Sequence, residues 1–157
     1  SSPKRDSATS SVVMAFTIPD DFGYCVLAVA LSWFVNYGLA MQVMSARSKY
    51  NVNYPLLYAD PSNDHSDDFN SVQRAHQNML EAWAPVSILC LVSGLVYPIL
   101  ATIFFMTWVL GRIVYGVGYA RGGPEKRTLG ALLSHLGDFP LLVLTFVAGF
   151  MMLLRKA

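Results

Sequence analysis

Residues 69–85, FNSVQRAHQNMLEAWAP, place three polar side chains at the start of a long apolar run that continues to Tyr97. If the stretch is an α-helix, Arg74, Asn78 and Glu81 lie within roughly 60° of one another, because each residue advances about 100°. A cation, an amide and a carboxylate on one helix face are costly at the edge of a hydrocarbon-length segment. The pattern therefore indicates either a functional site or a buried polar network.

The whole chain is unusually apolar. Of its 157 residues, 54% are hydrophobic and 13% are charged, and the mean hydropathy is +0.43. Charged residues are absent from three long runs, at 22–46, 82–111 and 139–154. A bilayer core about 30 Å thick is spanned by roughly 20 helical residues, so these runs predict membrane helices. The net charge of +1 argues against nucleic acid as a partner.

These runs predict an all-α integral membrane protein, an antiparallel up-down bundle of four transmembrane helices. We expect one membrane domain over residues 21–157, with helices near 22–46, 69–97, 99–120 and 129–154. Residues 1–20 form a tail that we expect to be disordered, since its start is Ser-rich and lacks apolar periodicity. The connections 47–68 and 121–128 lie on one side of the membrane, and their basic residues place that side in the cytosol. These residues are Arg47, Lys49, Arg121, Lys126 and Arg127, against Arg155 and Lys156 near the other side.

The second and third helices are joined by so short a turn that they must be antiparallel neighbours. Counted outward from the turn at Tyr97-Pro98, Glu81 and Tyr115 are equally distant in sequence, and Asn78 and Tyr119 nearly so. Each pair should therefore lie at a similar depth in the membrane. Arg112 shares a helix face with both tyrosines, at spacings of three and seven residues. The sequence therefore predicts one polar cluster near one membrane interface.

The fourth apolar run carries two polar residues, His135 and Asp138. An acid within a membrane segment needs a partner, and we expect Asp138 to pair with a bundle partner such as Arg112. His135 is expected to pack within the bundle, because no third ligand at metal-binding spacing accompanies the two residues. We therefore predict no metal site. Cys25 and Cys90 lie in apolar runs with no CxxC spacing and are expected to be buried free thiols.

The polar cluster suits a small ligand that carries carboxylates and an amine. Guanidinium groups bind carboxylates in a forked geometry, a carboxylate binds an ammonium, and Asn and Tyr satisfy amides. A zwitterionic tripeptide such as glutathione fits this set, and so do other anionic ligands. The set comprises Arg74, Arg112, Arg121, Lys126 and Arg127, with Asn78, Glu81, Tyr115 and Tyr119.

The segment RAHQNMLE at 74–81, with Arg112 and the two tyrosines Tyr115 and Tyr119, closely resembles the membrane-associated proteins in eicosanoid and glutathione metabolism, the MAPEG family. The segments FNSVQRAHQN and GYARGGPEKR look most like its microsomal glutathione transferase type 3 branch. The resemblance covers roughly residues 16–154. It implies four-helix subunits that form trimers and bind glutathione between adjacent subunits, facing the cytosol.

The resemblance also implies a role for individual residues. Its glutathione-binding positions match Arg47, Arg74, His76, Asn78, Glu81, Tyr115 and Tyr119. Arg127 matches the arginine that stabilises the glutathione thiolate, and so is the expected catalytic residue. Arg112 and Asp138 are expected to give structural polar support. Ala82 and Ser48 depart from the leukotriene-C synthase branch, which has Tyr and Arg there, and this argues against a leukotriene-synthase role.

The leading interpretation is an enzyme, a glutathione transferase or peroxidase acting on lipophilic electrophiles or lipid hydroperoxides that enter from the bilayer. Glutathione would be its substrate, and no metal cofactor is expected. Its expected partners are glutathione, the lipophilic second substrate, membrane lipids and further copies of the chain in a homotrimer of the endoplasmic reticulum membrane. Two alternatives stay open: a non-catalytic lipid-binding scaffold of the same family, and a small transporter or channel subunit with Arg112 and Asp138 as a buried pair.

Overall fold

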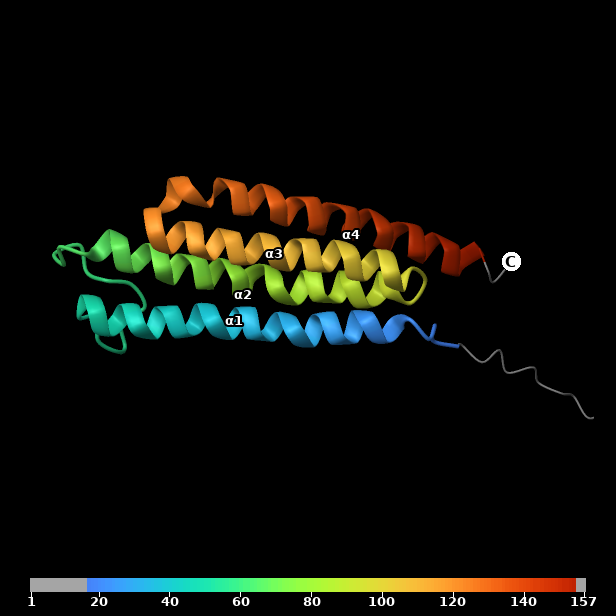
Figure 1. The fold of residues 1–157 in the computed structure, drawn as a ribbon, viewed down its shortest axis with the longest axis horizontal. Coiled ribbons are helices and arrows are strands. Elements are labelled where there is room, and N and C mark those ends of the chain that lie inside the picture. The colour runs from blue at the N-terminus through green and yellow to red at the C-terminus, as the bar shows by residue number, and fades with distance from the viewer. Residues whose placement is uncertain (1–16, 155–157) are drawn as a thin grey trace, which may run out of the picture.

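A computed structural model describes residues 17–154 of the chain. It contains four long helices, α1 (Phe22–Tyr50), α2 (Ser66–Gly94), α3 (Pro98–Gly122) and α4 (Thr128–Leu154), and a short 3₁₀ turn η1 (Pro124–Arg127) before α4. The helices lie side by side and antiparallel, with the two longer connections at one end of the bundle (Figure 1). The predicted all-α bundle of four helices is confirmed. The expected disordered tail, up to residue 16, and Arg155 and Lys156 lie outside the described residues.

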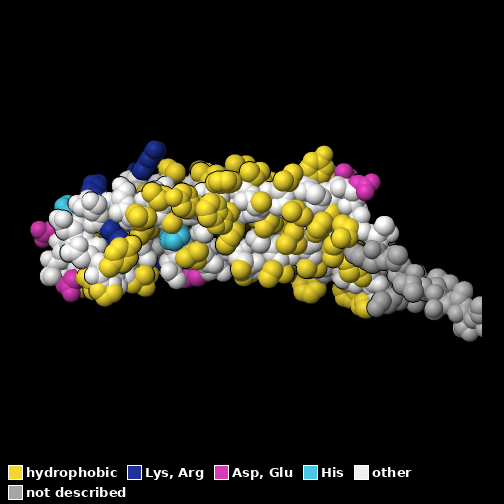
Figure 2. Space-filling view, turned by 90° about the horizontal axis from the view of Figure 1, so that it is seen from below, with side chains coloured by type: hydrophobic (Ala, Val, Ile, Leu, Met, Phe, Trp, Pro, Cys, Tyr) yellow, Lys and Arg dark blue, Asp and Glu magenta, His cyan; other side chains and the backbone are white. Residues whose placement is uncertain are grey.

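The protein is an integral membrane protein, although its helices differ in apolar character. Three segments are long and apolar enough to span a membrane: α1, α3 and residues 124–154. Helix α2 is as long as α1 but falls short by composition, because its first half carries Asp67, Asp68, Arg74 and Glu81. It packs against the other three helices, which can offer partners to its polar groups. On the face seen in Figure 2, hydrophobic side chains cover the middle, and most charged ones gather toward the ends.

Helix α1 extends one turn beyond its predicted end at Ala46 and finishes at Tyr50. Asn51 then adopts a left-handed conformation, with φ 57° and ψ 41°, and its amide donates to the Arg47 carbonyl. Asn tolerates this conformation better than most residues, so it is a suitable C-terminal cap. As a result Arg47 and Lys49 belong to the last helical turn, where cations interact favourably with the helix dipole.

Helix α2 ends earlier than predicted, at Gly94 rather than Tyr97. Pro98 disfavours a helical conformation for the residue before it, so the chain leaves the helix ahead of that point. The last turn tightens, and the Val96 amide donates to the Ser93 carbonyl at 3.1 Å. Pro98 itself begins α3, a position where its missing amide hydrogen costs nothing.

The early end of α2 changes which residues of α2 and α3 face each other. Ala75 packs with Tyr115 and Tyr119 in one buried cluster, and Arg112 hydrogen-bonds to Asn78 at 2.8 Å. The predicted register, which set Asn78 level with Tyr119, was therefore wrong by more than one turn. The pairing of α2 with α3 is therefore centred on the turn at residues 95–97, and not on Pro98 as the prediction assumed.

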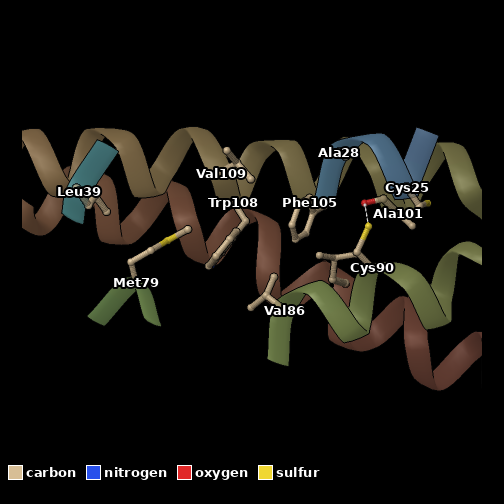
Figure 3. Close-up of a cluster of buried hydrophobic side chains, with 11 residues drawn as sticks. Cys25, Ala28, Leu39, Met79, Val86, Cys90, Ala101, Phe105, Trp108 and Val109 are labelled. Atoms are coloured by element: carbon tan, nitrogen blue, oxygen red, sulfur yellow. Dashed lines mark hydrogen bonds between the residues drawn. The ribbon is translucent and has the colours of Figure 1, made fainter. Parts of the chain in front are cut away.

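The apolar core draws residues from all four helices and is shown in Figure 3. Cys25 and Cys90 are free and buried, as predicted, and Cys90 Sγ donates to the Ala101 carbonyl at 3.8 Å. The fully buried large side chains of this core include Trp108, Phe105, Met79 and Leu141. At one end it reaches the polar cluster, because the guanidinium carbon of Arg112 lies 6.0 Å from the centre of the Trp108 ring.

Glycines bring α3, η1 and α4 close together. A Cβ atom at Gly111 would overlap the backbone of Ser134, and one at Gly130 would overlap the backbone of Tyr115. A Cβ atom at Gly118 would overlap the Lys126 carbonyl in η1. Such small residues allow backbones to approach closely in membrane bundles. Here the glycines allow η1 to pack closely against the end of α3, which carries the tyrosines of the predicted cluster.

Candidate functional site

One face of α2 carries a joined set of polar side chains. Arg74 Nη1 lies 2.8 Å from Glu81 Oε1, and Arg74 Nη2 lies 3.5 Å from Oε2. Asn78 Nδ2 also donates to Glu81 Oε2, at 3.3 Å. The Arg74 and Glu81 side chains are 42% and 46% exposed. The predicted shared face is confirmed, and its charged groups remain accessible to a ligand.

Arg112 extends this set from α3. It is 5% exposed, and its Nη2 donates to Asn78 Oδ1 at 2.8 Å. Its guanidinium carbon lies 4.3 Å from the centre of the Tyr115 ring. Its buried Nε has no hydrogen-bond partner among the described residues. Asn78 therefore accepts from one cation and donates to one carboxylate, which orients its amide and joins α2 to α3.

A second group of polar side chains forms where η1 meets α3. Arg127 Nη1 donates to the Tyr119 hydroxyl at 2.9 Å, and its guanidinium carbon lies 5.4 Å from the same ring. The Tyr115 and Tyr119 rings are 5.3 Å apart, and both residues are 5% exposed. Arg127 itself is exposed. Buried tyrosines thus hold an accessible guanidinium at the same end of the bundle as Arg74.

A cavity of about 540 Å³ is lined by one residue of each group, Arg74 and Tyr119, and by residues that the sequence analysis missed. Its lining residues are Tyr58, Asp67, Asn70, Ser71, Arg74, Tyr119 and Pro124. The spacing of Asn70, Ser71 and Arg74 on α2 is a helical signal that could have revealed the polar face extending toward the helix start. Tyr58 had no such signal, because it comes from the connecting loop. The loop is fastened by Asn70 Oδ1, which accepts from the Ala59 amide at 2.8 Å.

Arg47, a predicted glutathione contact, is engaged in the α1–α2 loop. Its Nη1 donates to the carbonyls of Val52 at 3.3 Å and Leu56 at 2.8 Å. Its guanidinium carbon lies 4.5 Å from the centre of the Tyr54 ring and 5.2 Å from that of Phe69. In this single chain Arg47 therefore holds the loop against the bundle, and it is not among the residues that line the cavity.

Two further predicted residues lie apart from the joined set. His76 is half-buried on the other side of α2 from Arg74. Both carboxylate oxygens of Asp138 lie 3.2 Å from His135 Nδ1. Among the described residues the direct contact of Asp138 is therefore on its own helix, and the predicted pairing with a bundle partner such as Arg112 is wrong. His135 is one turn away from Asp138 on the same helix, whereas the guanidinium of Arg112 is directed to Asn78 and Tyr115.

The two hydrogen-bonded groups combine three guanidinium groups with one carboxylate, two phenols and an amide, and the cavity adds the carboxylate of Asp67. In the hydrogen-bonded groups the cations are Arg74, Arg112 and Arg127, and the carboxylate is that of Glu81. Such a set can bind an anion through forked hydrogen bonds and an ammonium through the carboxylate. Among residues 17–154, no group of three or more His, Cys, Asp or Glu side chains could hold a metal ion.

Comparison with known proteins gives three matches that cover most of this bundle. The profile of the MAPEG family matches residues 25–148. The chain is 36% identical over 112 residues to microsomal glutathione S-transferase 2 of Bos taurus, a match that covers 70% of each chain. It is 34% identical over 123 residues to an uncharacterised protein of Synechocystis sp., covering 74% of this chain and 81% of that protein.

Proposed function

This chain belongs to the MAPEG family, and we propose that it is a membrane glutathione transferase that conjugates glutathione to lipophilic electrophiles. The same thiol chemistry would reduce lipid hydroperoxides, which makes glutathione-dependent peroxidase activity a second reaction of the same site. The observation that carries the proposal is the continuous hydrogen-bonded set of Arg74, Glu81, Asn78 and Arg112 beside Arg127 and Tyr119. The similarity to a microsomal glutathione S-transferase supports it.

The charges of the site complement those of glutathione. The peptide carries two carboxylates and one ammonium, and its reactive form adds a thiolate. Arg74 and Arg112 would bind carboxylates, Glu81 would bind the ammonium, and Arg127 would face the sulfur. Without a ligand, Arg74 and Glu81 satisfy each other across 2.8 Å. On binding, the Arg74–Glu81 ion pair would be replaced by two ion pairs, one between Arg74 and a ligand carboxylate and one between Glu81 and the ligand ammonium. Both side chains would therefore keep a partner of opposite charge in the occupied site.

Arg127 would stabilise the thiolate form of glutathione. A free thiol has a pKa of about 8.5, and half ionisation at pH 7 requires a shift of about 1.5 units, or roughly 2 kcal/mol of preference for the anion. A guanidinium can provide this, and it keeps its own proton at all relevant pH values. The bond to the Tyr119 hydroxyl, 2.9 Å long, would hold the group near the cavity mouth before the thiol arrives.

The chemical step follows from the thiolate. In the transferase reaction its sulfur forms a bond to an electrophilic carbon, and the leaving group departs with the bonding electron pair. In the peroxidase reaction the sulfur attacks the peroxide, the O–O bond breaks, and the alkoxide is protonated to an alcohol. The resulting sulfenic acid condenses with a second glutathione, giving glutathione disulfide and water. A half-exposed site next to apolar helix surfaces would admit such substrates from the bilayer.

We further propose that the protein is a homotrimer in the endoplasmic reticulum membrane with this site facing the cytosol. In one chain, Arg74 and Glu81 are nearly half exposed, and contact with a neighbouring subunit would shelter them from lipid. Native mass spectrometry in mild detergent checks the assembly. An active monomer would contradict the trimer without affecting the assignment of the reaction.

Glutathione binding by the purified protein tests the function itself. We expect retention of glutathione in equilibrium dialysis, and conjugates when a lipophilic electrophile is added. An Arg74→Met variant, which keeps most of the side-chain volume, should lose both. A protein that folds, binds lipid and retains no glutathione would instead favour the scaffold alternative.

A further inference from the structure

A groove runs along the outside of the bundle between α1 and α3. It consists of two adjoining hollows of about 290 Å³ and 300 Å³, which share Gln42 and Val117 in their linings. The first hollow reaches Lys49 and Arg121 near the loop end of the bundle. The second continues to Phe34, deeper along α1. The two hollows therefore adjoin along α1 and α3, and only Val72 in their linings comes from α2, the helix that carries the Arg74 and Glu81 face.

The loop end of the groove is cationic. Lys49 and Arg121 lie in the last turns of α1 and α3 and line the same hollow together with Ser45. Within residues 17–154, neither cation forms an ion pair. Lys49 Nζ only donates to the neighbouring Tyr50 hydroxyl, at 2.9 Å. Lys49 and Arg121 thus share one hollow, and Asp67 and Asp68, which line an adjacent hollow with Arg121, form no ion pair with either cation among the described residues.

The remainder of the groove is apolar and open. Phe34 is 65% exposed and Ile113 is 41% exposed. No atom would lie within 4 Å of a Cβ built on Gly38, so the groove is empty beside this residue. On its inner side the groove is closed by Leu39, whose side chain packs so tightly on Gly116 that a Cβ there would meet it. An apolar chain has room here and cannot pass into the core.

The length of the groove matches one leaflet of a membrane. From Lys49 to Phe34 the helix rises about 22 Å, at 1.5 Å per residue. A bilayer is about 40–45 Å thick with its headgroup regions, so one leaflet takes half of that. Cations at headgroup level and an apolar channel below them match, in order and in length, a lipid with an anionic headgroup. Basic pockets between transmembrane helices bind such headgroups.

We propose that this groove binds one anionic phospholipid of the surrounding membrane. The phosphate and headgroup lie on Lys49 and Arg121, with Ser45 as an additional donor. One acyl chain follows the channel past Gly38 and Ile113. The lining of the groove shares no residue with the cavity beside Arg74, and the proposal does not depend on the proposed reaction.

Lipid retention tests the proposal directly. The full chain is reconstituted into nanodiscs that contain equal amounts of phosphatidylserine and phosphatidylcholine. After release from the nanodiscs, the lipid that stays bound to the protein is counted by native mass spectrometry. We expect a preference for phosphatidylserine. Each basic residue near a membrane surface contributes roughly fivefold, so a Lys49→Gln/Arg121→Gln variant should lose that preference by about 30-fold. A Lys126→Gln variant, whose cation lies outside both hollows, is the charge control and should retain it.

A glycine pair tests the channel. Gly38→Leu adds a branched side chain where its Cβ has no neighbouring atom within 4 Å, and it should displace lipid of both kinds. Gly23→Leu adds the same side chain to the far end of α1, where space is equally open, and should leave retention unchanged. Equal retention of the two lipids by the wild type, or full retention by Gly38→Leu, would overturn the proposal. So would a change in subunit number in Gly38→Leu, because the groove would then be a contact between copies of the chain.

Discussion

Arg112 on α3 and Asn78 on α2 are joined by a hydrogen bond of 2.8 Å from the guanidinium to the amide oxygen. This contact fixes which way the Asn78 amide points, because its nitrogen must then face Glu81. A buried cation, an amide and a carboxylate therefore act as one unit across two helices. Loss of any member leaves another with an unsatisfied group, so single substitutions at this site should have large effects.

Glu81→Gln should weaken glutathione binding far more than His76→Gln does. The first change removes the charge that pairs with Arg74 at 2.8 Å, and the expected ligand ammonium loses its partner. A charge-assisted hydrogen bond contributes roughly 1.5–3 kcal/mol, or about 10- to 150-fold in Kd. His76 lies on the other side of α2 and serves as the matched control. Equal dissociation constants for the two variants, measured by calorimetry, would refute the assignment of Glu81.

Arg127→Ala should still bind glutathione but lose the ultraviolet absorbance of the thiolate and most of the transferase rate. The reason is that the remaining site holds the peptide while the cation next to the sulfur is gone. Lys126→Ala is the control, since Lys126 is adjacent in η1 but Arg127 makes the bond to Tyr119. Rapid-mixing absorbance measures the signal. Loss of the thiolate in the Lys126 variant, with the Arg127 variant unchanged, would show that the wrong residue was chosen.

Gly111→Ala should destabilise the bundle, whereas Gly38→Ala should not. The new methyl group at Gly111 meets the backbone of Ser134, and overpacking of this kind typically costs about 1–3 kcal/mol. Gly38 faces open space, so alanine there only gains helix propensity. Thermal unfolding in detergent, followed by circular dichroism, compares the two. A midpoint for Gly111→Ala at or above that of the wild type would contradict the close α3–α4 contact.

Arg47→Ala should release the loop between α1 and α2. The variant loses both hydrogen bonds to the Val52 and Leu56 carbonyls and the contacts with the Tyr54 and Phe69 rings. Hydrogen exchange followed by mass spectrometry should show faster exchange over residues 51–58. Lys49→Ala, in the same helical turn, should not. Unchanged exchange in the Arg47 variant would mean that the loop is held by its other contacts.

A cysteine introduced at Ser62 should be labelled in intact microsomes by a reagent that does not cross membranes. Ser62 is exposed in the α1–α2 loop, which we place in the cytosol on the basis of its basic residues. The native Cys25 and Cys90 are buried, so background labelling is expected to be low. Labelling that appears only after the membrane is permeabilised would reverse the proposed orientation.

The sequence alone was sufficient for the helices and for the polar face of α2. Three charge-free runs, the middle one divided by Tyr97-Pro98, predict four long helices, because charged side chains are excluded from hydrocarbon. Helical periodicity places Arg74, Asn78 and Glu81 on one face, since that relation depends only on residues within one helix. These local features required no knowledge of how the helices pack, and the structure confirms them.

The contacts between helices were decided only by the tertiary structure. The end of α2 at Gly94 sets the register with α3, and a shift of a few residues at a turn changes every pair along both helices. The partner of Arg112 then depends on how far its long side chain reaches. The position of Tyr58 depends on the hydrogen bond between the Ala59 amide and Asn70, which holds its loop against α2. Such contacts join residues distant in sequence, and no periodicity within one helix specifies them.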